Sequence, residues 1–139
     1  MAPVSSRVSA VCLRLPAPLL AAALWYLSSQ SKLPVEVPLF GFDKVAHFGA
    51  YALFAACAYL WFLPRAAFSR PRLAYWLSVS IAVLWGALDE VHQSFVPGRF
   101  ASVWDLLADT LGALVGAWCM ARLVIAARVF LTPKSSNKP

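Results

Sequence analysis

The stretch "SVWDLLADTLGALVGAW", residues 102–118, combines a helix start, two acids and two glycines. Four of its residues are spaced three or four apart and form one stripe along an α-helix: Asp105, Asp109, Gly112 and Gly116. Ser102 precedes Asp105 by three residues, the capping-box relation that favours a helix start. The small-xxx-small glycine pair lets a neighbouring helix approach closely. We therefore expect a tightly packed helix whose acids point into a bundle.

The composition places the rest of the chain in a membrane. Of its 139 residues, 61% are hydrophobic and 13% are charged, and the mean hydropathy is +0.70. These values lie outside the usual range for a soluble domain of this length. The net charge of +6 could suggest nucleic-acid binding, but the basic residues lie in loops and tails and form no patch with interleaved aromatics. We expect no nucleic-acid partner.

Four apolar blocks are separated by prolines or charges, and each predicts a membrane-spanning helix. Their approximate ranges are 11–28, 43–63, 72–94 and 102–127. Four spans use most of the chain, so we predict an all-α, polytopic four-helix transmembrane bundle that forms a single domain, 1–139, with a disordered tail at 132–139. The first block is the weakest. It also resembles a signal peptide, but no convincing cleavage site follows Leu27, which favours a retained span.

Basic residues are distributed unevenly between the two predicted sides of the membrane. The side with both termini carries nine: Arg7, Arg14, Arg65, Arg70, Arg72, Arg122, Arg128, Lys134 and Lys138. The other side carries three, Lys32, Lys44 and Arg99. The positive-inside rule therefore predicts that both termini are cytoplasmic, in a multi-pass protein of the cytoplasmic (inner) membrane.

The acids and histidines show the opposite asymmetry. All of them fall on the predicted non-cytoplasmic side: Glu36, Asp43, Asp89, Glu90, Asp105, Asp109, His47 and His92. Charged groups at membrane depth are costly and usually pair with one another or serve a function. We therefore expect a polar site near the outer leaflet.

Helical spacing indicates which of these side chains converge. Lys44, His47 and Tyr51 share one face of the second block, and Gly86, Glu90 and Gln93 line one stripe of the third. Asp89 lies at the border of this stripe, whereas we expect His92 to point away into solvent.

The carboxylate of Glu90 lies at the C-terminal end of its helix, against the unfavourable pole of the helix dipole. It should therefore have a compensating partner. Arg99, Lys44 and His47 are the candidates.

Two segments, "FDKVAHFGAYALF" and "DEVHQSFVPGRFASVWDLLADTLGALVG", resemble the VanZ-like family of small bacterial integral membrane proteins over residues 43–118. The markers that match, in order, are Asp43, Lys44, His47, Glu90, Gln93, Pro97, Gly98, Arg99, Ser102, Asp105 and Gly112. Asp109 departs from the pattern, because we expect the family to carry Asn there more often. The resemblance implies a bacterial cell-envelope protein, with a link to low-level resistance to the glycopeptide teicoplanin. The family has no agreed biochemical reaction.

Our first hypothesis is a site for an anionic lipid head group or a lipid-linked envelope precursor. Candidate binding residues are Lys44, Tyr51, Gln93, Arg99, Ser102 and Asp105. Arg99 and Lys44 would hold phosphate. Candidate catalytic residues are His47, Glu90 and Asp109, of which His47 and Glu90 would form the proton-handling pair. No Ser or Cys nucleophile has an adjacent base in the sequence, so we assign no reaction.

Asp105 and Asp109 would either orient the basic residues or hold a divalent cation through oxygen ligands. One well-placed histidine gives too few nitrogen or sulfur ligands for zinc. We therefore assign neither a metal nor a cofactor.

The alternative is a structural module whose polar cluster is an internal salt-bridge network. Its function would then lie in binding a partner membrane protein or a second copy of the chain. Asp43, Ser102 and Asp105 could serve mainly as helix caps. Proton transport through Glu90 and Asp109 is less favoured, because no chain of ionisable residues continues to the cytoplasmic side.

Overall fold

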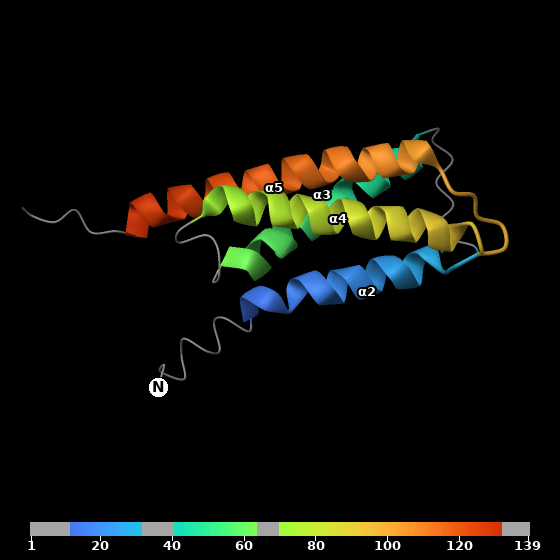
Figure 1. Cartoon of the computed structure of the whole chain (residues 1–139), viewed down its shortest axis with the longest axis horizontal. Coiled ribbons are helices and arrows are strands. Elements are labelled where there is room, and N and C mark those ends of the chain that lie inside the picture. Colours follow the sequence, from blue (N-terminus) through green and yellow to red (C-terminus); the bar gives the residue numbers. More distant parts are fainter. Residues whose placement is uncertain (1–11, 32–40, 64–69, 132–139) are drawn as a thin grey trace, which may run out of the picture.

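The computed structural model describes residues 12–31, 41–63 and 70–131 (Figure 1). These residues form four helices and no strand: α2 (Pro16–Ser28), α3 (Phe42–Phe62), α4 (Pro71–Gln93) and α5 (Val103–Leu131). The all-α prediction is therefore confirmed. The chain runs up and down, so the end of α2, the start of α3, the end of α4 and the start of α5 lie together at one end of the bundle (Figure 1). We call this the polar end.

Local sequence determines where the helices begin. Gly41 precedes α3 with a φ of 84°, a left-handed conformation that favours glycine. Pro71 occupies the first turn of α4, where its missing N–H costs no hydrogen bond. Before α5, the hydroxyl of Ser102 accepts a hydrogen bond from the backbone N–H of Asp105 at 3.3 Å. Ser102 is therefore the predicted N-cap.

Three of the helices are long and apolar enough to cross a membrane: Phe42–Phe62, Pro71–Gln93 and Val103–Ala127. The apolar helix that includes α2, Cys12–Ser28, is shorter than the ~20 residues that a span requires. The membrane character of the chain is thus supported. The fourth span and the cytoplasmic position of both termini remain predictions.

The most extensive helix contact joins α3 to α5, and the glycine stripe explains it. A Cβ atom at Gly112 would collide with the backbone carbonyl of Phe48, and one at Gly116 would collide with that of Ala52. The two backbones therefore approach as closely as the small-residue spacing predicts. Around them the core holds small side chains such as Ala55.

Large apolar side chains lie mainly on the outside of the bundle. Examples are Leu53, Leu84, Trp118 and Leu123. This arrangement suits a bundle surrounded by lipid, because lipid tails are as apolar as the side chains themselves. The polar side chains then have to meet one another inside.

Candidate functional site

Buried polar side chains gather at the polar end. Of the seven in the described ranges, all but Ser78 lie there: Ser28, Asp89, Glu90, Gln93, Asp105 and Asp109. Four of them are carboxylates. Buried charge requires partners, so the contacts of each group indicate what this end of the molecule can bind.

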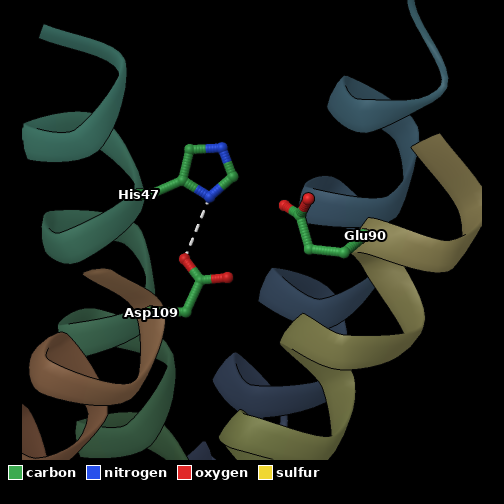
Figure 2. Close-up of side chains that lie close together, drawn as sticks. All are labelled: His47, Glu90 and Asp109. Atoms are coloured by element: carbon green, nitrogen blue, oxygen red, sulfur yellow. Dashed lines mark hydrogen bonds and ion pairs between the residues drawn. The ribbon is translucent and has the colours of Figure 1, made fainter. Parts of the chain in front are cut away.

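His47 on α3, Glu90 on α4 and Asp109 on α5 point into one shared space (Figure 2). Each offers one nitrogen or oxygen atom, and these three atoms lie within 4.8 Å of one another. His47 Nδ1 and Asp109 Oδ1 are 2.9 Å apart, and Asp109 is fully buried. We call these three residues the acid–histidine cluster.

The cluster and its neighbour Tyr51 contain three polar atoms that lack a hydrogen-bond partner among the described residues. These are Glu90 Oε1, Asp109 Oδ2 and the neighbouring hydroxyl of Tyr51. The Tyr51 ring stacks beside that of His47, with their centroids 6.4 Å apart. An unsatisfied buried polar atom costs about 1–3 kcal/mol, and native proteins contain few of them. Three together indicate a place where a ligand or water completes the bonding.

The second oxygen of Glu90 completes the cap of α5. Glu90 Oε2 accepts a hydrogen bond from the backbone N–H of Ser102 at 2.5 Å. In a capping box, the carboxylate three residues beyond the cap would accept this bond. Here that carboxylate, Asp105, instead pairs with Lys44 Nζ at 2.5 Å. Lys44 also pairs with Asp43 at 2.7 Å, so its ammonium group is held between two acids.

Asp89 has its own set of neutral donors. The hydroxyl of Ser28 donates to one carboxylate oxygen at 2.5 Å, and the amide of Gln93 donates to the other at 3.0 Å. Ser28 lies 61 positions away in the sequence. No local spacing could have predicted this contact between α2 and α4.

His92 is not solvent-exposed, contrary to the prediction. It is half-buried and stacks on Trp25 with ring centroids 4.1 Å apart. Its Nε2 also lies 2.9 Å from the hydroxyl of Ser29. The expectation failed because it considered only the stripe facing α3 and α5, whereas α2 covers the other side of α4.

A pocket of about 170 Å³ lies between α2, α3, α4 and the loop after α4, and we call it the polar pocket because charged and polar side chains line it beside apolar ones. Its lining is Leu24, Leu27, Ser28, Asp43, Ala46, His47, Ala50, Tyr51, Asp89, Gln93 and Arg99. The Nε atom of Arg99 has no hydrogen-bond partner in the described part of the chain. Of the three candidates to compensate Glu90, His47 is the one that the cluster brings beside it.

An apolar groove of about 290 Å³ adjoins the same three helices. Its lining is Ala17, Pro18, Ala21, Phe54, Ala58, Trp61, Phe62, Ile81 and Trp85. On α4, Ile81 and Trp85 of the groove and Asp89 and Gln93 of the pocket are spaced four apart, so they share one helix face. The groove and the polar pocket therefore lie along the same face of α4.

The predicted site residues thus fall into neighbouring groups. The cluster contains the three catalytic candidates, with Tyr51 beside them. Gln93 and Arg99 line the polar pocket, which also includes His47 and Tyr51. Lys44, Ser102 and Asp105 form the start of α5 and its ion pair. Sequence reasoning missed the role of α2, whose Ser28 hydroxyl donates a hydrogen bond to the carboxylate of Asp89.

Comparison with known families identifies one match. The VanZ/LLP1 family model matches residues 9–126, a longer range than the resemblance in the sequence motifs. No curated protein and no solved structure gives a significant match. The matched range includes α2, α3 and α4, most of α5, and every residue of the polar end described above. The chain therefore belongs to the VanZ/LLP1 family.

Proposed function

We propose that the polar end binds the phosphate-bearing head group of a membrane lipid or lipid-linked envelope precursor, with an acyl or prenyl chain in the apolar groove. The observation that carries this proposal is that two cavities of different character are lined by the same three helices. A polar pocket and an apolar groove follow one another along α2, α3 and α4. This succession matches the two chemically different parts of a lipid.

Arg99 is the residue that we assign to the phosphate. It lines the polar pocket, and its guanidinium Nε is not engaged with the described residues. A guanidinium group binds phosphate through paired hydrogen bonds in a fixed geometry. Lys44, the other cation expected at the phosphate, is already held by Asp43 and Asp105. We therefore give Lys44 the role of neutralising Asp105.

The distribution of charge along the chain orients this site. Nine basic residues and no acid lie on the side predicted to be cytoplasmic, so the polar end faces the outer leaflet of the cytoplasmic membrane. Head groups of envelope precursors and phospholipids are present at that surface. A role in tolerance of glycopeptides such as teicoplanin would follow from altered handling of such a precursor.

Lipid retention by the purified protein tests this proposal. The protein in a neutral detergent is incubated with phosphatidylglycerol, and bound lipid is counted by native mass spectrometry. We expect Arg99→Gln to weaken binding about tenfold, because a hydrogen bond to a charged group contributes about 1.5–3 kcal/mol. Ala21→Phe should also reduce retention, because its larger side chain fills the apolar groove.

The matched control is Arg122→Gln. Arg122 lies over the ring of Trp118 at 5.9 Å on α5, away from both cavities. Its loss removes the same charge and should leave lipid retention unchanged. Equal retention by the wild type, Arg99→Gln and Ala21→Phe would refute the proposal.

A salt-bridge network that only fixes helix register is the second candidate, and the Lys44–Asp105 pair favours it. The two candidates predict different results for Arg99→Gln. If the polar end has only a structural role, this substitution leaves lipid retention unchanged, and it has little effect on the melting temperature because none of the ion pairs among the described residues includes Arg99. If the polar end is a ligand site, lipid retention falls.

A further inference from the structure

We propose that the acid–histidine cluster, His47, Glu90 and Asp109, binds a divalent metal cation. The inference concerns a second ligand, beyond the lipid, and does not require the lipid to be bound. Three side chains from three different helices present one ligand atom each within a space of 4.8 Å. Metal sites that act on other molecules typically have three protein ligands and keep further positions open.

The bonding of the two carboxylates leaves one oxygen of each for a cation. Glu90 Oε2 accepts the Ser102 N–H, and Asp109 Oδ1 lies 2.9 Å from His47 Nδ1. Their other oxygens, Oε1 and Oδ2, have no hydrogen-bond partner among the described residues. Glu90 is only 7% exposed and Asp109 is 0% exposed. Figure 2 shows both carboxylates directed at the space that they share with His47.

Close packing maintains this space. A Cβ atom at Gly86 would lie 2.9 Å from Asp109 Oδ2 and 3.2 Å from the Tyr51 ring. The free oxygen of Asp109 is therefore held against the backbone of α4, one turn from Glu90. A side chain at position 86 would displace it. The glycine thus positions a ligand atom as well as allowing helix contact.

Charge balance supports a cation at this position. The described part of the polar end has four buried carboxylates, Asp89, Glu90, Asp105 and Asp109. Lys44 pairs with one of them, Asp105, and also with Asp43 outside the core, and His47 is an ion-pair partner of Asp109 only while its imidazole is protonated. Uncompensated buried anions are costly. A divalent cation between Glu90 and Asp109 would neutralise both.

The donor set indicates the class of cation. One imidazole nitrogen and two carboxylate oxygens suit Mn²⁺ or Fe²⁺ better than a soft ion such as Cu⁺. The sequence-based assignment of no metal rested on zinc's need for more nitrogen or sulfur ligands. That argument does not apply to a cation that accepts carboxylate oxygens. Because His47 also lines the polar pocket, the cation would lie next to a bound phosphate.

Titration with Mn²⁺ alone tests the inference. Protein purified in a neutral detergent without phospholipid is treated with EDTA, dialysed and titrated, and free Mn²⁺ is measured by electron paramagnetic resonance. We expect saturable binding of one ion per chain. Glu90→Gln and Asp109→Asn each remove a metal ligand. Each should weaken Mn²⁺ binding by at least about tenfold, because even the loss of a group that only hydrogen-bonds to a metal ligand typically lowers metal affinity by about 10–100-fold.

Asp89→Asn is the matched control. Asp89 is adjacent to Glu90 and also buried, but both of its oxygens accept hydrogen bonds from neutral donors. Binding of Mn²⁺ should therefore be retained in this variant. Size-exclusion profiles and helical circular dichroism show whether each variant folds. If Asp109→Asn does not fold, two measurements remain. Glu90→Gln should still show weakened Mn²⁺ binding, and Mn²⁺ should raise the melting temperature of the wild type.

Three results would overturn the inference: no saturable binding by the wild type, unchanged binding by the folded cluster variants, or an equal loss in Asp89→Asn. The titration contains no phospholipid and the lipid experiment can be run in EDTA. A failure of the metal site is therefore distinguishable from a failure of the proposed lipid site.

Discussion

At the scale of single residues, two carboxylates at the polar end, those of Glu90 and Asp105, have partners other than those of an ordinary capping box. Glu90 on α4 accepts the N–H of Ser102, which a capping box would give to Asp105. Asp105 is then free to pair with Lys44 on α3. One hydrogen bond from a backbone N–H to a side-chain carboxylate thus links the start of α5 to the end of α4, and one ion pair links α5 to α3.

A double-mutant cycle on Lys44 and Asp105 tests this linkage. Lys44→Gln leaves the buried Asp105 carboxylate without its cation, so we expect the free energy of unfolding to fall by more than about 1 kcal/mol. The double variant Lys44→Gln/Asp105→Asn should recover part of that loss, because no unpaired charge remains. Thermal unfolding in detergent measures all four proteins. Additive effects of the two substitutions would contradict a direct ion pair.

At the scale of helices, the glycine stripe determines how closely α3 and α5 approach. Gly116→Ala would place a methyl group against the backbone carbonyl of Ala52, and backbone cannot move aside as a flexible side chain can. Overpacking of this kind costs about 1–3 kcal/mol. We expect a corresponding decrease in the melting temperature of the purified protein.

Gly49→Ala is the control for helix propensity. Gly49 lies within α3, and a Cβ atom there would have no neighbour within 4 Å. Alanine is favoured over glycine in a helix by about 1 kcal/mol, so this variant should be as stable as the wild type or more stable. A destabilisation by Gly49→Ala as large as that by Gly116→Ala would show that packing against Ala52 is not the cause.

The helices and their polar faces could be predicted from the sequence, because both follow from local periodicity. The spacing of Asp105, Asp109, Gly112 and Gly116 predicts a stripe that faces another helix, and the structure places Gly112 and Gly116 against α3. The contacts of α2 could not be predicted in this way. Ser28 donates a hydrogen bond to Asp89, and Trp25 stacks on His92. Both contacts depend on how α2 packs against α4, and no periodic pattern in the sequence encodes that packing.

The partner of each charge could be predicted only in part. The position of Glu90 at a helix end predicts a compensating partner but does not distinguish among Arg99, Lys44 and His47, of which the structure brings His47 into the same cluster. Which of the three candidates lies beside Glu90 depends in part on loop geometry. Gly98 has a φ of 82°, and the turn that it forms places Arg99 at the polar pocket. A difference of one or two residues in such a loop would redirect the guanidinium group.

At the scale of the whole molecule, the fold separates two surfaces. Large apolar side chains cover the outside of the bundle, and inside one end acids from two helices meet a histidine from a third. The polar pocket and apolar groove both lie where the shorter helix α2 rests on α3 and α4. A lipid could therefore enter from the side of the bundle between α2 and its neighbours, with its head group passing to the polar end.

An experimental structure in a lipid nanodisc containing phosphatidylglycerol and Mn²⁺ tests the central claim most directly. The account predicts phosphate density beside Arg99, a hydrocarbon chain along Phe54, Ala58 and Trp85, and a metal peak between His47, Glu90 and Asp109. Side chains of Glu90 and His47 that point away from each other into solvent or hydrocarbon, with both cavities closed, would contradict it.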